Sequence, residues 1–465
     1  MQKLSLIIEP KSTFQATSLT SVLSKDHISD LARTNGAIVR ERLFSLSDYL
    51  LNAANLMCSS TKKSEFTLCS LHDSYNRLNP EKSMSHKCIH KQLQNEKTLD
   101  VMKSLLSEIM TLPSASSFIK KIKKALPENL SKLLKQLKVN DIILIDGTEI
   151  DLSYSCANNF YCKGKGRPHL DGTTARPGLK LHIAFSMVKQ TFEYFEITEA
   201  VGSERACVYP EKFKNTLIIA DRGYIDEELE QRIADSGNFF LIRGRNNTTG
   251  IINSAYSDSG EELSNLIDKT IKDLPLTTNA DLTIKTTKGN NLRVVIRHHN
   301  KDEESETRSV LRTNIPKDRL CARQIYLLYR IRWSIELFNK ANKQSSCLQS
   351  INSANKNIIL LFILLSLMVS FIKTYLGHKA RINNKIEWLS MLKLHNLNFG
   401  FNKLFQSLQN KGLSTVYQIV KELLDDIALY CKRSKPSNRD SVLFKDLPML
   451  LWQIVNTNRP HAKSA

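Results

Sequence analysis

NDIILIDGTEIDL, residues 140–152, is the stretch that decides the fold class, because a run of branched apolar residues is bounded there by Asn and Asp. Short apolar runs interrupted by Gly, Asp and Asn are typical of buried strands. An amphipathic segment that ends at Gly237 predicts a helix between the last two such runs. This alternation predicts an α/β sheet. The other runs are GLKLHIAFSMV (178–188), FEYFEIT (192–198), NTLIIADRGY (215–224) and NFFLIRGR (238–245).

The regions on either side of these strands have a different character. Residues 13–135 show helical periodicity with short breaks and no competing strand alternation. Residues 246–315 contain ADLTIKTT, LRVVIRHH and SVLRTN, which indicate a small β-rich insertion. One long helix is expected from about Asp318 to Gln344, and amphipathic helices follow Gly377. The predicted division of the chain is therefore 1–137, 138–375 and 376–465.

The charge of the chain indicates its class of partner. A formal net charge of +20 and a pI near 9.4 favour polyanions, because binding releases their counterions. Nucleic acid is the first candidate, and the alternative is a basic protein that its charge keeps soluble.

The cysteines and the first residues indicate the compartment. Nine scattered cysteines without a CxxC pair predict neither a zinc site nor a disulfide framework. The opening MQKLSLIIEPKSTF lacks the features of a secretory signal. A reducing cytoplasm is therefore the expected location, with the protein on the nucleoid when it is bound to DNA.

One run is apolar enough to raise the question of a membrane. Ile358–Ile372 spans 15 residues, which is shorter than the roughly 20 needed to cross a bilayer. A helix that is apolar all round is expected at the centre of a large domain. We therefore expect a buried core helix between Lys356 and Lys373, and no membrane partner.

The segment YRIRWSIELFNKANK, residues 329–343, places polar side chains on one helical face. At 100 degrees per residue, Tyr329, Arg332, Glu336 and Lys343 fall within a sector of about 60 degrees. Taken alone, this spacing also fits a solvent-exposed face with ordinary ion pairs. The residues predicted on the opposite, buried side are Leu327, Leu328, Ile331, Ile335 and Phe338.

Two aspartates follow apolar strands of the predicted sheet. Asp146 ends the run IILI, and Asp221 ends LIIA. Side chains at strand ends of such a sheet lie at its crevices, although Asp-Gly and Asp-Arg-Gly are also turn-like sequences. Together with Glu336, these aspartates would supply hard oxygen ligands for one or two Mg²⁺ ions. Glu149, Asp151 and Asp226 are the nearby substitutes.

This combination of groups suits phosphodiester chemistry. One metal ion would activate the attacking water or 3′-hydroxyl, and the other would stabilise the leaving oxygen. Arg332 and Lys343 would bind phosphate oxygens, and Tyr329 would hydrogen-bond a backbone phosphate near the cut.

At these residues the sequence resembles a known family. The spacing Tyr-x₂-Arg-x₃-Glu-x₆-Lys is similar to the YREK signature of a large group of bacterial insertion-sequence transposases of the DDE type. Four other motifs resemble that family in order and separation. They are Asp146-Gly147-Thr148, Lys180-Leu181-His182, Asp221-Arg222-Gly223-Tyr224 and the TNIP sequence at 313–316.

The resemblance implies a fold, an activity and partners. The expected fold is α/β, with an RNase H-like catalytic core that carries the insertion at about 246–315, flanked by helical regions. Asp146, Asp221 and Glu336 would bind two Mg²⁺ ions, for which Mn²⁺ can substitute. The enzyme would cut the terminal inverted repeats of a transposon and join them to target DNA as a homodimer. Residues 1–137 would bind DNA, and residues 376–465 are the candidate dimerisation region.

One departure concerns the hairpin intermediate that several relatives form. Hairpin-forming relatives stack a flipped base on a tryptophan of the insertion. Here the tryptophans are Trp333, Trp388 and Trp452, all outside the insertion. Tyr256 or another residue would replace the stacking surface.

Two further segments are candidates for DNA contact. FTLCSLHDSYNRL and MSHKCIHKQL, residues 66–78 and 84–93, predict two helices with a tight turn. In the second helix Met84, Cys88, Ile89 and Leu93 are expected to face inward, and Ser85, His86, Lys87, His90 and Lys91 outward. This is either a groove-reading helix or an ordinary helix pair. The loop CKGKGRPHLDGTTARPG is either a phosphate-binding or a merely solvated loop, and its basic residues are Lys163, Lys165, Arg167 and Arg176.

Other interpretations remain at this stage. His182 is expected to be a hydrogen-bonded sheet histidine rather than a neighbour of the metal ions. The main enzymatic rival is an RNase H-like endonuclease without strand transfer. A transposon-derived DNA-binding protein or repressor that has lost catalysis is the rival from another class.

Overall fold

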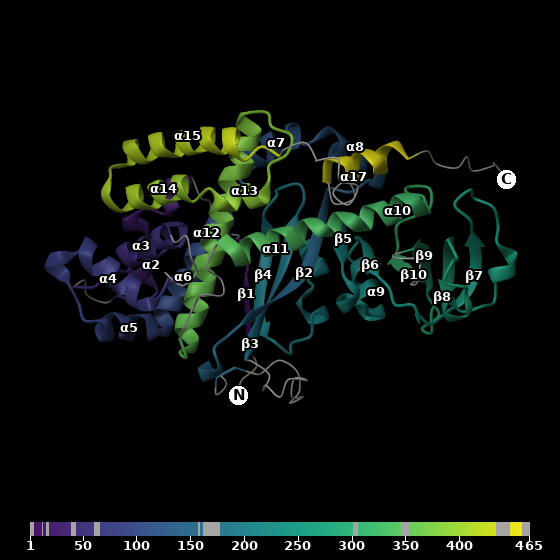
Figure 1. Ribbon diagram of the computed structural model, residues 1–465, viewed down its shortest axis with the longest axis horizontal. Coiled ribbons are helices and arrows are strands. Elements are labelled where there is room, and N and C mark those ends of the chain that lie inside the picture. The colour runs from purple at the N-terminus through teal and green to yellow at the C-terminus, as the bar shows by residue number, and fades with distance from the viewer. Residues whose placement is uncertain are drawn as a thin grey trace.

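The computed structural model has a central sheet with helices packed around it (Figure 1). Helices α10 (Ala322–Tyr329) and α11 (Trp333–Ser345) cross the sheet, most of the terminal helices gather at one end of it, and the insertion lies at the other. The predicted α/β fold with helical terminal regions is confirmed. The structure describes residues 4–11, 13–14, 18–38, 43–59, 66–156, 159–160, 177–300, 306–345, 353–433 and 447–457.

The ten strands of the described residues form one sheet in the order β1-β4-β3-β2-β5-β6-β10-β9-β8-β7. β2 pairs in parallel with β5, and β5 pairs in parallel with β6, whereas the other pairings are antiparallel. The strands are β1 (Ser5–Ile8), β2 (Asp141–Asp151), β3 (Gly178–Ser186), β4 (Phe192–Glu199), β5 (Thr216–Ala220), β6 (Phe239–Arg243), β7 (Ile251–Tyr256), β8 (Ala280–Lys285), β9 (Asn291–Asn300) and β10 (Glu306–Thr313).

Both faces of the central strands are buried, as their near-continuous apolar runs require. Ile142 and Leu144 of β2 pack in the core that contains the terminal helices. Ile143 and Ile145 pack in a second core, which includes Leu229 of helix α9 (Glu227–Asp235). Consecutive strand residues therefore face opposite layers, so Asp146 shares the face of Leu144.

The insertion is continuous with the central sheet. Its strands β7 to β10 form a meander, and β10 pairs with β6 of the core. One buried ion pair supports this junction and another lies within the insertion. Arg312 on β10 donates to both carboxylate oxygens of Glu230 on α9 at 2.7 Å, and Arg293 donates to both oxygens of Asp281 at 2.9 and 2.7 Å.

In the part of the N-terminal region that the structure describes, the regular elements are helices and one strand, β1, which the sequence analysis did not predict. β1 pairs with β4, so residues near the start of the chain form the edge of the sheet. The helices of this region are α1 (Leu19–Val22), α2 (Lys25–Thr34), α3 (Leu46–Ser59), α4 (Leu68–Leu78), α5 (His86–Gln94), α6 (Glu96–Ile109), α7 (Ser116–Lys124) and α8 (Glu128–Leu137).

The C-terminal helices pack back on the rest of the chain. α14 (Asn398–Asn410) lies against α3, and α17 (Leu447–Asn456) lies against α8 and α10 (Figure 1). The other helices of this part are α12 (Lys356–Asn383), α13 (Met391–Asn396) and α15 (Leu413–Tyr430).

Helix α12 is the predicted core helix, although it continues well beyond the apolar run. Within the described residues it alone is long and apolar enough to cross a membrane, and its most apolar window is completely buried in the molecule. Lys373, expected at the flank of this helix, is fully buried within it. Its ammonium group donates to the carbonyl oxygen of His395 at 2.7 Å and to Oδ1 of Asn398 at 3.2 Å.

The predicted single helix from about Asp318 to Gln344 is two helices in the structure. A 3₁₀ turn at Arg330–Arg332 separates α10 from α11. This tighter turn falls where Tyr329 and Arg332 reach carboxylates on the sheet. The prediction of the buried stripe is confirmed for Leu328, Ile331, Ile335 and Phe338, whereas Leu327 is only partly buried.

Candidate active site

The two aspartates lie where the parallel pairing of β2 with β5 stops. The last paired residues are Ile145 and Ala220, and Asp146 and Asp221 come next on each strand. Asp221 directly follows β5, as predicted. The prediction that Asp146 ends its strand is wrong, because β2 continues to Asp151 in antiparallel pairing with β3. Pairing with β3 therefore excludes a turn at Asp146.

The substitutes considered for these aspartates lie elsewhere. Glu149 and Asp151 are odd-numbered steps along β2 from Asp146, so they face the opposite layer. Asp226 caps α9 by accepting the backbone amides of Glu228 and Leu229 at 2.8 and 3.2 Å.

Helix α11, which carries Glu336, contacts Asp146, and helix α10 before it contacts Asp221. Asn339 on α11 donates from Nδ2 to Oδ2 of Asp146 at 2.9 Å. Tyr329, the last residue of α10, donates from its hydroxyl to Oδ1 of Asp221 at 3.1 Å. These two hydrogen bonds hold α10 and α11 over the ends of the parallel ladder.

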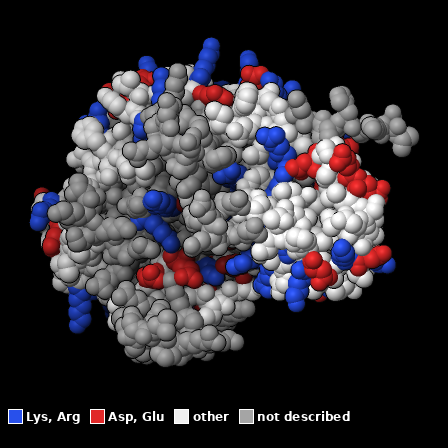
Figure 2. All heavy atoms as spheres, turned by 45° about the vertical axis from the view of Figure 1, so that its right-hand side comes forward, with Lys and Arg blue, Asp and Glu red and all other residues white. Residues whose placement is uncertain are grey.

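Arg332 lies between two of the three carboxylates. Its guanidinium contacts Oε1 of Glu336, and its Nη1 lies 3.7 Å from Oδ1 of Asp146. The side chain of Arg332 is 14% exposed and that of Asp146 is 18% exposed. The site is thus partly shielded from water. Figure 2 shows that acidic and basic side chains also adjoin on the molecular face drawn there.

The carboxylates share one electrostatic environment. Burial raises the pKa of Asp146 to about 6, Arg332 and Asn339 oppose this rise, and Glu336 and Asp221 add to it. Burial also raises the pKa of Tyr329, and the neighbouring Asp221 contributes to the rise. The pKa of Asp146 therefore responds to both other acidic residues, as expected of groups that meet at one site.

The donor set suits a hard divalent cation, since carboxylate oxygens are the ligands that Mg²⁺ and Mn²⁺ prefer. In the arrangement observed, no three His, Cys, Asp or Glu side chains of the described residues are close enough together to hold a metal ion. Arg332 occupies the space between Asp146 and Glu336 instead. A metal ion that bridges Asp146 and Glu336 would take the place that the guanidinium occupies.

The other predicted DNA contacts have different outcomes. Lys343 lies on α11 and is partly buried. Lys87 and Lys91 are exposed on α5, as predicted. The inward position predicted for Cys88 is wrong, because it is exposed, whereas Ile89 and Leu93 alone are fully buried in this helix. The basic loop residues Lys163, Lys165, Arg167 and Arg176 lie outside the described residues.

His182 is a buried sheet histidine, as expected. It is 1% exposed, and its Nε2 hydrogen-bonds Oγ1 of Thr198 at 3.0 Å. Burial lowers the pKa of His182 to about 4, which keeps the ring neutral at pH 7. It pairs with Gly147 in the β2–β3 ladder and faces the layer opposite Asp146.

Tyr256, considered as a stacking surface, is partly covered by a cation. The ammonium group of Lys317 lies 4.3 Å from the centre of the Tyr256 ring. One face of the ring is therefore already in a cation–π contact. Among the tryptophans, Trp388 is 8% exposed, whereas Trp333 and Trp452 are 37% and 54% exposed.

Three residues near the carboxylates were missed by the sequence analysis. Asn339 lies three residues after Glu336, a spacing that places both on one side of the helix. Arg243 ends β6, close enough to Tyr329 to influence its pKa. Arg243 and Arg330 also lower the pKa of His299, after the larger effects of burial and His298. Arg243 therefore brings positive charge close to Tyr329, the residue that donates to Asp221.

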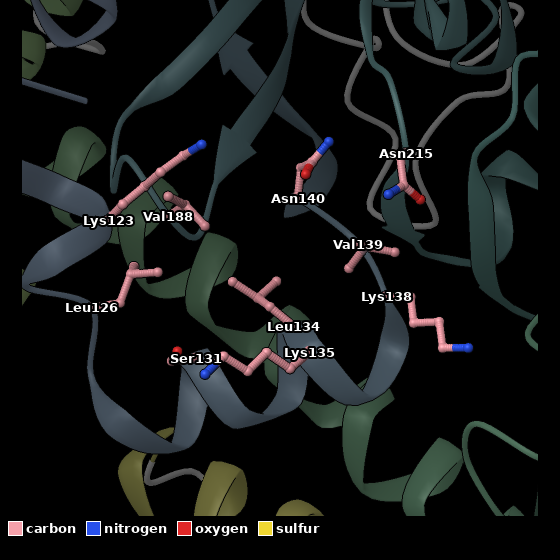
Figure 3. A pocket seen from close by; sticks show the side chains of 10 residues that line it. All are labelled: Lys123, Leu126, Ser131, Leu134, Lys135, Lys138, Val139, Asn140, Val188 and Asn215. Atoms are coloured by element: carbon pink, nitrogen blue, oxygen red, sulfur yellow. The ribbon is translucent and has the colours of Figure 1, made fainter. Parts of the chain in front are cut away.

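A separate basic hollow of about 320 Å³ lies at the other end of β2. It is lined by Lys123 of α7, Lys135 of α8, Lys138 and Asn140, among others. Figure 3 shows that the ammonium groups of Lys123, Lys135 and Lys138 point in different directions. Because they do not converge and no carboxylate of the described residues lines the hollow, it offers no catalytic constellation.

The middle of the chain matches a known protein family. The family profile described as the transposase DDE domain matches residues 138–372. The chain belongs to the DDE transposase family. The matched segment begins at Lys138, ends within α12 and contains all three carboxylates described above. No curated protein sequence matches the chain.

Membership of the DDE transposases brings general properties to this chain. Such enzymes bind DNA and generally use divalent metal ions. The mixed α/β sheet with helical terminal regions is consistent with the RNase H-like fold of a DDE transposase.

Proposed function

We propose that this DDE transposase cuts the ends of an insertion sequence and transfers them to target DNA by a cut-and-paste reaction. Asp146, Asp221 and Glu336 would be its catalytic metal ligands. The observation that carries the proposal is the set of contacts from α10, α11 and the 3₁₀ turn between them to both aspartates, inside the matched domain. The YREK spacing of Tyr329, Arg332, Glu336 and Lys343 supports assignment to that group of transposases.

The proposed cofactor is a pair of Mg²⁺ ions, for which Mn²⁺ can substitute. When bound, the ions would activate the attacking oxygen and stabilise the leaving oxygen. The residues of the chain would position the DNA. Arg332, displaced from the carboxylates, would bind a phosphate oxygen, and Tyr329 would orient the backbone beside the cut. Lys343 would bind a phosphate further along α11.

DNA recognition would involve several surfaces of the chain. The exposed Lys87 and Lys91 of α5 would contact the terminal repeat. Arg243 and Arg330 would contact the backbone beside the active site, because their positive field lies next to Tyr329 and His299. Lys163, Lys165, Arg167 and Arg176 of the loop would add phosphate contacts.

The proposal extends to the whole chain. Residues 1–137 would bind DNA, residues 138–375 would carry catalysis, and residues 376–465 would contribute to a homodimer that brings two transposon ends together. The double-stranded substrates would be the terminal inverted repeats and the target DNA, both reached in the bacterial cytoplasm.

The test uses the purified protein, Mg²⁺ and DNA that contains the inverted repeats flanking the coding region. The expected result is cleavage at the ends followed by joining to a target plasmid. D146A, D221A and E336A should each abolish cleavage and leave end binding largely intact. Cleavage without joining would establish the endonuclease, and specific binding without cleavage would establish the silent DNA-binding protein. Normal cutting by any of the three variants would remove that residue from the site.

A further inference from the structure

The carboxylate of Glu204 lies against two glycines that belong to the aspartate motifs. A Cβ atom built on Gly223 would lie 1.9 Å from Oε2 of Glu204, so this oxygen occupies the place of a side chain at residue 223. A Cβ atom on Gly147 would lie 3.4 Å from Oε1 of the same carboxylate. Gly147 follows Asp146, and Gly223 is two residues after Asp221. One side chain therefore lies against Gly223 and beside Gly147, one glycine in each aspartate-bearing segment.

This contact comes where backbone pairing no longer joins the two segments. The parallel ladder between β2 and β5 ends at Ile145 and Ala220, directly before the aspartates. Beyond that point the chain of β5 leaves the sheet and forms the 3₁₀ turn Arg222–Tyr224. The Glu204 carboxylate bridges the two segments within a few residues of the end of the ladder.

The surroundings of Glu204 hold its carboxylate in place. Lys180 on β3 donates from Nζ to Oε1 at 2.9 Å, and the side chains of Lys180 and Glu204 are 14% and 26% exposed. The Tyr224 hydroxyl and Nδ1 of His182 face the same space, each 3.4 Å from the Cβ position of Gly147. Glu204 and Asp146 both help to raise the pKa of Tyr224, after the larger effect of burial. The Glu204 carboxylate thus lies on the face of the sheet opposite Asp146.

We propose that Glu204 is a positioning residue of the active site, which sets the separation of Asp146 and Asp221 by bridging Gly147 and Gly223. The proposal rests on the proposed function, because it assumes that both aspartates bind the same metal ions. It also explains the residue type at position 223. Any side chain there would displace the Glu204 carboxylate, although the backbone of Gly223 does not have the positive φ that only glycine adopts easily.

The decisive measurement is Mn²⁺ binding to the full chain by calorimetry, for wild type, E204A, E204Q, G223A and the double variant G223A/E204A. G223A pushes the carboxylate away without removing it, so it tests the same contact by an independent route. We expect E204A and G223A each to weaken Mn²⁺ binding by about 10- to 100-fold, the usual effect of removing a group that supports a metal ligand. E204Q should have a smaller effect than E204A, because the glutamine side chain keeps the shape of Glu204. Some effect should remain, because the charge that pairs with Lys180 is lost.

The double variant separates positioning from general damage. If both changes act through the same contact, G223A/E204A should bind Mn²⁺ no more weakly than E204A, since there is then no carboxylate for the added methyl group to displace. Metal-free binding to transposon ends should stay near wild type in all variants, whereas the melting temperature of E204A should fall, because Lys180 loses its carboxylate partner. E211A is the matched control, because Glu211 is an exposed acid that pairs with Arg232 at 3.5 Å. It should leave Mn²⁺ binding unchanged.

D146A serves as the reference that distinguishes this inference from the proposed function. Loss of Mn²⁺ binding in D146A together with unchanged binding in E204A would overturn the role of Glu204 and leave the metal site standing. Additive losses in the double variant would overturn it equally, because they would mean that Gly223 and Glu204 act separately. Unchanged binding in D146A would overturn the metal site itself, and the role of Glu204 with it.

Discussion

Asn339 donates a hydrogen bond from Nδ2 to Oδ2 of Asp146 at 2.9 Å. Asn339 lies on α11 about one helical turn after Glu336, so the same helix provides one carboxylate of the site and the support of another. An amide at this position orients the Asp146 carboxylate without adding charge. It therefore leaves the other lone pairs of Asp146 for a cation.

Replacing Asn339 by alanine should impair the site while the helix remains folded. N339A removes the donor to Asp146, and we expect Mn²⁺ affinity and cleavage rate to fall by about 10- to 100-fold. N339L should behave similarly, since it restores volume but no donor. Calorimetry and a cleavage assay would measure these effects. K340A is the control, because Lys340 is exposed on the same helix. Equal activities of N339A and K340A would contradict the role of Asn339.

Arg332 should stabilise the protein most when no metal ion is bound. It contacts both Glu336 and Asp146, so R332A leaves two partly buried carboxylates without their cation. We expect the free energy of unfolding to fall by about 1–3 kcal/mol, less than for a fully buried pair because Glu336 is 30% exposed.

The same variant should respond more strongly to metal. Mn²⁺ would take over the neutralisation of both carboxylates, so it should raise the melting temperature of R332A more than that of wild type. Differential scanning fluorimetry with and without Mn²⁺ would measure both effects. R332K keeps the charge, so its melting temperature and its response to Mn²⁺ should lie between those of wild type and R332A. A metal-free R332A that melts like wild type would show that the guanidinium contributes nothing to the resting site.

The strands were predictable because their apolar runs are local features of the sequence. The five runs of the core and the three of the insertion all became strands. β1 and β7 were missed. β7, with the sequence IINSAY, is short and contains two adjacent polar residues, so its apolar pattern is weak. β1 has only four residues and its pairing partner is remote, since Ser5 pairs with Thr198. Asp146 was misplaced for a similar reason. Asp-Gly is a turn-like pair, but a long antiparallel ladder with β3 overrides that local preference.

The candidate site was only partly predictable. Glu336, Arg332 and Tyr329 could be grouped because helical spacing puts them on one face, even though a 3₁₀ turn interrupts the helix. Asn339 carries no charge and gave no comparable signal. Glu204 lies in an irregular segment between β4 and β5, and its contacts with Gly147 and Gly223 depend on how three remote segments pack. Such tertiary contacts leave no periodic trace in the sequence.

The two exposed lysines of α5 should act on DNA through charge. If Lys87 and Lys91 each contact a phosphate, K87A/K91A should weaken end binding and reduce the slope of log affinity against log salt by about 0.9 for each lysine. Fluorescence anisotropy over a salt series would measure this. K269A/K272A removes two exposed lysines of the insertion and serves as the control. A slope that is equal in both double variants would argue against a DNA contact through α5.

Asp141 should make stability depend on pH independently of the active site. Its carboxylate accepts the Ser186 hydroxyl at 2.5 Å and the backbone amides of Ile142 and Val188 at 2.7 and 3.1 Å. Burial raises the pKa of Asp141 to about 7, and these hydrogen bonds oppose the rise. The folded protein therefore retains a proton on this group that the unfolded chain, with an ordinary pKa near 3.8, has already lost.

The sign of the effect follows from this difference. The stabilising contribution of the protonated form is complete below pH 4 and is lost as the pH rises towards 7, by at most about 1.4 kcal/mol for each pH unit. D141N cannot ionise, so its free energy of unfolding should fall less steeply over this window than that of wild type. Urea unfolding at about pH 5, 6, 7 and 8 would measure the difference. S186A removes a donor that lowers the pKa of Asp141, so it should shift the pH range over which stability is lost to higher pH. Identical pH dependence in wild type and D141N would mean that Asp141 stays ionised in the folded protein.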